Sequence, residues 1–271
     1  MSAKEMGENG GGIWIQGGGE LASGVAMRLA RCGYAVVAAE INNPLAVRRM
    51  VSFSEAVYDG RIEVEGITGR LVSPGKVRFV RGEVTVLVDP KASCLSGLAP
   101  AAVIDARMTK LEPEPLPCKG IPLIALGPGF YAGRNADFVI ETHREARLGE
   151  VITEGEASPN TGVPGKVGGQ SSARVVRSPA DGRLEPLVLI GDMVEAGQCL
   201  GRVGGQEVRS GLAGIVRGLI HPSAELSAGV KVGDVDPRGG AIDPALVSDK
   251  ALGIAGGVME ALLRLRIQPW V

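Results

Sequence analysis

The sequence lacks the features that mark several large classes of protein. Its 29 basic residues are matched by 30 acidic ones, so the formal net charge of −1 creates no field that would attract nucleic acid. Aromatic residues make up only 3% of the chain, too few for base-stacking platforms. No apolar run approaches the roughly 20 residues of a membrane helix, and residues 1–12 are polar, without an export pattern. We therefore expect a cytoplasmic protein that binds neither nucleic acid nor membranes, with residues 1–12 flexible.

Metal-binding side chains are also scarce. The chain has four cysteines, no two of them at the spacing of a metal knuckle, and two histidines. We therefore expect no metal site and four reduced thiols. Cys94 is a weak catalytic candidate, because Lys91 lies three residues away and is placed to lower the pKa of its thiol.

Glycine, by contrast, is abundant, with 41 residues, and it dominates a turn near the start of the chain. The pattern predicts a strand over residues 13–16, a glycine turn over 17–24, a helix from about 21 to 32 and a second strand over 34–39. This is the order of a dinucleotide-binding fold, in which glycines let the backbone approach a diphosphate and an acidic residue binds ribose. The predicted ligand contacts are Gly17, Gly18, Gly19, Gly24 and Glu40.

Two features depart from that pattern. The glycines follow the spacing G-x-G-x-x-x-x-G rather than G-x-G-x-x-G, and Glu20 places a negative charge where phosphate would bind. The alternative that the glycines only pack the helix against the strand therefore stays open.

Further apolar runs predict more strands of a parallel sheet, namely residues 84–88, 102–104, 122–126 and 138–140. Ligands collect at the carboxyl ends of such strands. Gly127 and Gly129 follow one of these runs and could form a second anion-binding turn, with Arg134 as its charge partner.

Turn formers dominate residues 148–169, which we interpret as a loop or linker between domains. Within it, Asn160 and Thr161 could instead belong to an ordered loop that reaches back over the nucleotide edge.

A repeat follows this linker. Residues 176–203 align without a gap on residues 208–235, with nine identities at an offset of 32. One copy is too small to bury a face alone, so two copies related by a pseudo-twofold axis are expected to interlock into a flattened barrel. The repeat resembles biotinyl and lipoyl carrier domains, whose modified lysine lies at the hairpin between the halves. Residues 202–208 contain no lysine there, so we expect neither biotin nor lipoate and interpret the repeat as a rigid docking module.

The predicted fold class is therefore α/β followed by β. Residues 1–165 form a Rossmann-like parallel sheet domain, residues 170–240 a biotinyl/lipoyl-like barrel-sandwich hybrid, and residues 241–271 a C-terminal helical segment that packs on the N-terminal domain. Ser248 and Asp249 are the expected N-cap of that helix, which should run to about Leu265.

Six stretches spread over nearly the whole chain carry a family resemblance. They are residues 17–24, 47–58, 127–130, 159–165, 231–238 and 248–251. On these stretches the chain resembles the YqeB family, accessory proteins of the selenium-dependent molybdenum hydroxylase system. The resemblance implies a factor that matures a molybdenum enzyme by handling its pterin cofactor or the selenium or sulfur ligand.

Three functions stay open. The leading hypothesis is a maturation factor that binds a nucleotide or molybdopterin dinucleotide in the α/β domain and docks the hydroxylase through the β module. The second is an NAD(P)-dependent oxidoreductase that uses Glu40 for ribose, although no acid/base pair is evident beside the glycine turn. The third is a non-catalytic binding module with a degenerate loop. The sequence leaves open whether the chain is an enzyme and whether it forms a homo-oligomer.

Overall fold

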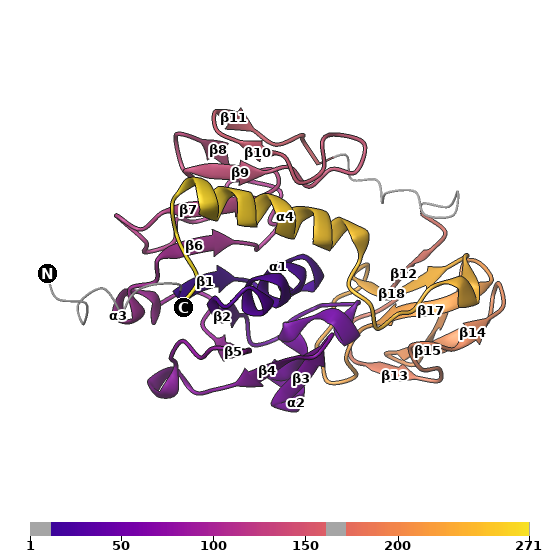
Figure 1. Ribbon diagram of the computed structural model, residues 1–271. Helices are drawn as coiled ribbons and strands as arrows, with labels where there is room; N and C mark the ends of the chain where they lie inside the picture. Colours follow the sequence, from indigo (N-terminus) through magenta and orange to yellow (C-terminus); the bar gives the residue numbers. More distant parts are fainter. Residues whose placement is uncertain (1–11, 161–171, 271) are drawn as a thin grey trace, which may run out of the picture. The chain divides into compact units, whose positions relative to one another are not determined.

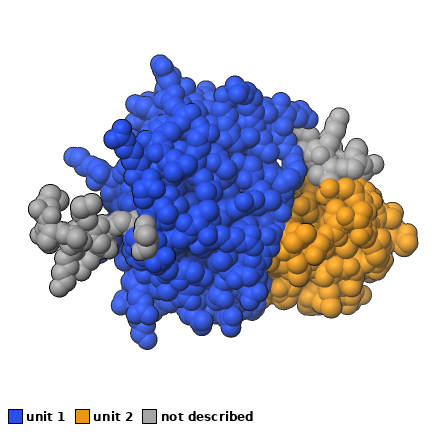
Figure 2. Space-filling view, viewed as in Figure 1, with its two compact units in different colours: residues 1–42, 52–160, 247–271 blue, residues 43–51, 161–246 orange. Residues whose placement is uncertain are grey.

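The computed structural model describes residues 12–160 and 172–270, which form two compact units. Unit 1 comprises residues 1–42, 52–160 and 247–271, and unit 2 comprises residues 43–51 and 161–246 (Figure 2). In the described part of the chain, no helix has the length and apolar character needed to cross a membrane.

Unit 1 is a mixed α/β structure built on a nine-stranded sheet with the order β10-β9-β7-β6-β1-β2-β5-β4-β3. Its strands are β1 (Gly12–Gln16), β2 (Ala35–Glu40), β3 (Arg61–Val64), β4 (Ile67–Leu71), β5 (Glu83–Val88), β6 (Ala102–Asp105), β7 (Leu123–Leu126), β9 (Phe138–Ile140) and β10 (Val151–Ile152). Only the β3–β4 and β9–β10 pairs are antiparallel. A separate pair is formed by β8 (Tyr131–Ala132) and β11 (Gly155–Glu156).

The central strands are mostly apolar, as expected of a parallel sheet that is covered on both faces. Ile13, Trp14 and Ile15 of β1 are completely buried. The indole Nε1 of Trp14 donates to Gln16 Oε1 at 3.0 Å, and Gln16 Nε2 donates to the carbonyl of Asp89 at 3.1 Å. The side-chain nitrogens of Trp14 and Gln16 therefore have hydrogen-bond acceptors inside the core.

The helices of unit 1 are α1 (Glu20–Arg31), α2 (Ala56–Asp59), α3 (Leu95–Leu98) and α4 (Asp249–Arg264), with 3₁₀ turns η2 (Phe53–Glu55) and η3 (Pro74–Lys76). Figure 1 shows α1 and α4 side by side on one face of the sheet. A Cβ atom at Gly24 would lie 2.7 Å from the Cβ of Ala251, so these helices approach more closely than larger residues would allow. Ser248 Oγ accepts from the backbone N–H of Ala251 at 3.2 Å, which confirms the predicted N-cap of α4.

Unit 2 consists of two antiparallel sheets, β12-β18-β17-β14 and β13-β15-β16. The strands are β12 (Val175–Arg177), β13 (Leu184–Pro186), β14 (Met193–Val194), β15 (Cys199–Val203), β16 (Gln206–Arg209), β17 (Gly214–Leu219) and β18 (Lys231–Asp236). The 3₁₀ turns η1 (Arg49–Val51) and η4 (Gly239–Ala241) also belong to this unit.

The two halves of unit 2 are joined by reciprocal hydrogen bonds. Arg177 of the first half donates to the carbonyl of Gly229 in the second half at 2.8 Å. At positions 32 residues away, Arg209 of the second half donates to the carbonyl of Gly197 in the first half at 2.7 Å. Each half therefore supplies an arginine to a turn of the other half, at equivalent positions of the repeat.

The boundary of unit 2 differs from the predicted one. Residues 43–51 were expected in the α/β domain, but they belong to unit 2. Arg48 donates to the carbonyls of Pro244 and Leu246 at 3.3 and 2.8 Å, and Asn43 exchanges two hydrogen bonds of 2.9 Å with the backbone of Glu225. These partners lie some 180–200 residues further along the chain, so no local sequence pattern reveals them.

Candidate functional site

The candidate site is the carboxyl edge of the parallel strands of unit 1. From β1 the sheet continues to β2 and β5 on one side and to β6, β7 and β9 on the other, so the chain reverses its direction of winding at β1. Ligands of open α/β sheets bind beyond the carboxyl ends of the strands at such a reversal. The glycine turn follows β1 at this point, and Glu40 ends the neighbouring β2.

The three glycines of the turn have different surroundings. Gly17 has a φ of +113°, and a Cβ atom there would lie 3.0 Å from the carbonyl oxygen of Ala106. A Cβ atom at Gly18 would lie 3.0 Å from Glu40 Cγ and from the backbone nitrogen of Ser54. A Cβ atom at Gly19 would meet nothing within 4 Å. Gly17 and Gly18 therefore permit close packing within the protein, whereas Gly19 borders open space.

Glu40 anchors the turn. Its Oε1 accepts from the backbone N–H of Gly18 at 2.7 Å, and its Oε2 accepts from that of Ile41 at 2.8 Å. Burial raises the pKa of the Glu40 carboxyl, and the two backbone hydrogen bonds only partly oppose that rise. Each carboxylate oxygen retains a second lone pair, so the contacts are compatible with the predicted hydrogen bonds to ribose.

Two serines that the sequence did not single out also support the turn. Ser23 Oγ donates to the carbonyl of Gly18 at 2.9 Å and accepts from the backbone N–H of Phe53 at 2.7 Å. The N–H of Ser54 donates to the same Gly18 carbonyl at 2.9 Å. The hydroxyl of Ser54 is buried and has no hydrogen-bond partner in the described part of the chain. Gly24, predicted as a ligand contact, is buried between α1 and α4 instead.

At the second predicted anion site, around Gly129 and Arg134, the neighbouring groups belong to the protein's own residues 111 and 112. Gly129 has a φ of +100°, and a Cβ atom there would lie 2.5 Å from the carbonyl oxygen of Leu111. Arg134 was expected to pair with a bound anion, but its guanidinium lies 3.5 Å from Glu112 and 5.2 Å from the ring centroid of Tyr131. Both side chains of this ion pair are mostly exposed, so it contributes little stability.

The loop after β9 is ordered by a carboxylate. Glu141 accepts from the backbone N–H groups of His143 and Ser158 at 2.7 and 2.8 Å. Burial raises the pKa of Glu141, but these hydrogen bonds outweigh it, and the net pKa is lowered. The contact holds residue 158 beside the end of β9, two positions before the exposed Asn160. Thr161, the other residue predicted in this loop, lies outside the described residues.

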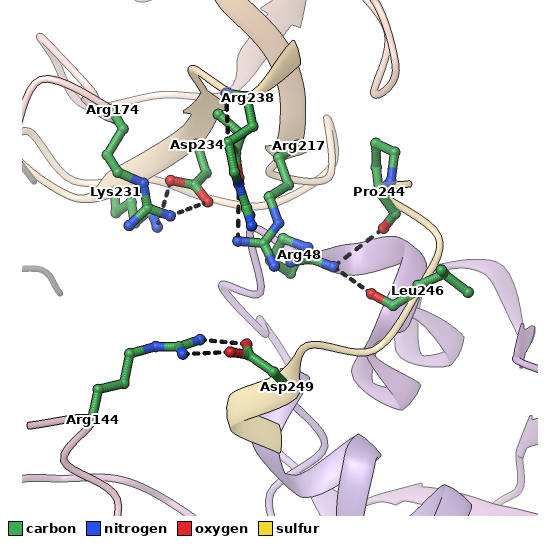
Figure 3. Close-up of polar contacts among 11 residues, drawn as sticks. Arg48, Arg144, Arg174, Arg217, Lys231, Asp234, Arg238, Pro244, Leu246 and Asp249 are labelled. Carbon is green, nitrogen blue, oxygen red and sulfur yellow. Dashed lines mark hydrogen bonds and ion pairs between the residues drawn. The ribbon is translucent and has the colours of Figure 1, made fainter. Parts of the chain in front are cut away.

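Lys250 is the residue that sequence reasoning missed. It lies in the first turn of α4 and is partly buried. Burial lowers the pKa of its ammonium group, as does the nearby positive charge of Arg144, while Glu20 and Glu141 oppose the change. Arg144 itself forms two bonds of 2.7 Å with Asp249 (Figure 3). The charges of Glu20 in the first turn of α1 and of Glu141 and Arg144 in the loop after β9 therefore act on Lys250.

Cys94 has the opposite electrostatic environment to the expected one. Its backbone N–H donates to Asp89 Oδ2 at 2.7 Å. Burial raises the pKa of the Cys94 thiol, and the neighbouring Asp89 raises it further. The pKa of Cys94 is therefore raised rather than lowered, contrary to the expected effect of Lys91. The thiolate is disfavoured at neutral pH.

Unit 2 presents glycines where carrier domains have a modified lysine. Val203 pairs with Gln206 across a two-residue turn, Gly204-Gly205, with φ values of +56° and +77°. Lys231, the single lysine of the repeat, lies 3.6 Å from the buried Asp234 in β18 (Figure 3). The described hairpin tip therefore offers no amine for an acyl arm.

Comparison with known proteins identifies a homologue. No family model matches the chain. The chain is 43% identical over 259 residues to the Escherichia coli (strain K12) protein called "Uncharacterized protein YqeB". The match covers 94% of this chain and 48% of that protein, so the chain spans about half the length of the curated relative.

Solved structures give weaker likenesses. An aspartoacylase family protein from Mesorhizobium loti is 14% identical, with 84% of this chain and 85% of that chain covered and a TM-score of 0.26. The product-bound ectoine utilization protein EutE (DoeB) from Ruegeria pomeroyi is 26% identical over 31% of this chain and 27% of that chain, with a TM-score of 0.22. These TM-scores do not establish a common fold.

Proposed function

We propose that the chain binds a nucleotide-bearing ligand at the carboxyl edge of the unit 1 sheet. The observation that carries the proposal is the parallel order β5-β2-β1-β6-β7-β9, with a glycine turn directly after β1 and Glu40 at the end of β2. This order is the one of Rossmann-like, doubly wound folds, in which the turn after the first strand receives a diphosphate.

The residues present suit such a ligand. The first bond of α1 runs from the N–H of Ser23 to the carbonyl of Gly19, so the N–H groups of the first turn find no acceptor within the helix. They lie next to the open space at Gly19 and can receive phosphate oxygens. Glu40 is placed to accept from ribose hydroxyls at the neighbouring strand end.

The pathway comes from the family resemblance and is part of the proposal. The ligand would be molybdopterin dinucleotide or a related nucleotide, and the chain would serve the maturation of a selenium-dependent molybdenum hydroxylase. Unit 2, with its interlocked halves resembling a barrel-sandwich hybrid, would dock that enzyme. The exposed Gly204-Gly205 tip supports docking rather than the transport of an acyl group.

Native mass spectrometry of the freshly purified chain tests the proposal first, with a retained nucleotide or pterin dinucleotide as the expected result. Titration calorimetry with ADP, CDP and NAD then compares the wild type with Gly19→Leu, which should abolish binding. Gly75→Leu is the matched control, because a Cβ atom at Gly75 also meets nothing within 4 Å and the residue is exposed. Equal binding by wild type and Gly19→Leu would place the ligand elsewhere.

The oxidoreductase alternative is favoured by one observation, the position of Glu40 at the end of β2, where NAD-dependent enzymes bind ribose. It predicts that NAD or NADP binds and is reduced in the presence of some small substrate. Binding of NAD without turnover would favour the maturation factor. Absence of any nucleotide binding would favour the degenerate binding module.

A further inference from the structure

Glu20 presents an electrostatic difficulty for the proposed ligand. It is the first residue of α1 and directly follows Gly19, the glycine that borders open space. A carboxylate at this position repels a diphosphate that approaches the N-terminus of the helix. A cation beside this position would weaken that repulsion.

The tertiary structure brings such a cation from a distant part of the sequence. The close contact of α1 with α4 at Gly24 and Ala251 places the first turn of α4 beside the second turn of α1, which begins four residues after Glu20. Lys250, the residue before Ala251, interacts electrostatically with Glu20. The other charged groups around Lys250 are Glu141 and Arg144 of the loop after β9 and its neighbour Asp249.

The ammonium group of Lys250 has capacity for a ligand. Within residues 12–160 and 172–270 it forms no hydrogen bond and no ion pair, whereas Asp249 and Arg144 are joined by two bonds. It is partly buried, lies near the positive charge of Arg144 and occupies the positive end of the α4 dipole. All three conditions disfavour the charged form, and Glu20 and Glu141 offset them only in part, so an anion that arrives would stabilise the ammonium group.

A second group beside the glycine turn is also available to a ligand. Ser54 is 1% exposed, and its Oγ has no hydrogen-bond partner among the described residues. The backbone of Ser54 is bonded to Gly18, so the hydroxyl belongs to a residue in direct contact with the turn. Buried hydroxyls without a partner are rare in folded proteins and often mark sites where a ligand or water binds.

We propose that Lys250 binds the diphosphate of the ligand beside Gly19 and thereby offsets the charge of Glu20. The inference rests on the proposed function and sharpens it, because it names the chemical class that is recognised. A nucleoside diphosphate or a dinucleotide with a diphosphate bridge should bind, and a nucleoside without phosphate should bind weakly.

The test is titration calorimetry with ADP, CDP and inorganic pyrophosphate, and with adenosine and cytidine for comparison. Lys250→Gln should weaken the binding of the diphosphates about tenfold, the loss expected for one charge-assisted hydrogen bond, and leave the binding of nucleosides unchanged. Lys250→Arg retains the charge and should stay within about threefold of the wild type. Lys76→Gln, at an exposed lysine in η3, is the matched control, and circular dichroism checks that each variant is folded.

The pH dependence gives a second readout. Anion binding requires protonated Lys250, so the affinity of the wild type for ADP should fall as the pH rises through the lowered pKa of this lysine. Lys250→Arg should show a flatter profile, because arginine stays charged. Unchanged ADP affinity in Lys250→Gln overturns this inference alone. Failure of the wild type to bind any diphosphate overturns both the inference and the proposed function.

Discussion

Strand β6 of unit 1 and strand β18 of unit 2 end in the same arrangement of an aspartate and an arginine two residues later. Arg107 Nε donates to Asp105 Oδ1 at 3.0 Å, and Arg238 Nε donates to Asp236 Oδ1 at 2.9 Å. Each aspartate also accepts from the backbone N–H of its arginine, at 3.2 and 3.1 Å. Their side chains are 1% and 0% exposed. The sequence Asp-x-Arg therefore forms the same fork in a parallel and an antiparallel sheet.

The surroundings of the two forks differ. In unit 1 the fork at Asp105 precedes Ala106, whose carbonyl packs against Gly17, close to the open space at Gly19. In unit 2 a further guanidinium, that of Arg217, lies 3.7 Å from Asp236 (Figure 3). An ion pair at a strand end thus stabilises the chain in both units, and it does not by itself mark a ligand site. The unit 1 edge is a candidate site because it combines open space at Gly19 with an ammonium group that forms no ion pair within residues 12–160 and 172–270.

The largest expected effect comes from removing the aspartates. Asp105→Ala and Asp236→Ala should each lower the free energy of unfolding by about 3 kcal/mol, because several charge-assisted hydrogen bonds to a buried carboxylate are lost. Urea unfolding followed by circular dichroism measures both, and fluorescence of Trp14 and Trp270 reports on unit 1. Glu195→Ala, at an exposed residue of unit 2, should stay within about 0.5 kcal/mol. A negligible loss in Asp105→Ala would break the comparison of the two forks.

The glycine turns of the two units should differ in their tolerance of alanine. Gly17→Ala should cost about 2–3 kcal/mol, because the positive φ is strained and the Cβ atom meets the Ala106 carbonyl. Gly205→Ala, with a φ of +77° but open surroundings, should cost only about 1 kcal/mol. Urea unfolding measures the free energy lost in each variant. Equal losses in Gly17→Ala and Gly205→Ala would show that Gly17 does not pack against the Ala106 carbonyl.

Acidification should affect the two units with opposite signs. Burial raises the pKa of Asp236, but Arg238 and Arg217 outweigh it, so the net pKa is lowered. Its contribution to stability is present above the pKa of the unfolded chain and is lost as the pH falls through the folded pKa. Glu40 has a raised pKa, so its contribution is present at low pH and is lost as the pH rises.

Unfolding curves of Asp236→Asn and Glu40→Gln between pH 7 and about pH 3 measure how much each carboxyl contributes to the pH dependence of the free energy of unfolding. Asp236→Asn should lose less stability on acidification than the wild type, and Glu40→Gln should lose more. A variant with the slope of the wild type would show that the substituted carboxyl contributes nothing to the acid sensitivity.

The smallest effect on stability is expected at Gly19. Gly19→Ala should change the free energy of unfolding by less than about 0.5 kcal/mol, because a Cβ atom meets nothing within 4 Å and φ is −69°. A stability loss as large as that of Gly17→Ala would show that the space beside Gly19 is filled. The contrast between Gly17 and Gly19 separates a glycine that serves packing from the one that we propose to contact a ligand.

Much of the local structure could be predicted from the sequence. The order of strand, glycine turn, helix and strand over residues 12–40 was predicted correctly, because apolar periodicity and turn glycines are local signals. The repeat with offset 32 predicted a β-rich unit, and the antiparallel sheets of unit 2 agree with it. Ser248 predicted the start of α4. The roles of Arg134 and Gly24 could not be predicted, since their partners Glu112 and Ala251 are specified by tertiary packing.

The sequence by itself determined the strand, glycine turn, helix and strand over residues 12–40, the start of α4, the duplication within unit 2 and the absence of a lysine at residues 202–208. Propensity, periodicity and internal identity act over short distances or are counted directly. Only the tertiary structure decided that residues 43–51 belong to unit 2 and that Lys250 lies near Glu20. Both depend on contacts between residues some 180–230 positions apart, which side-chain packing and burial create and no local pattern encodes.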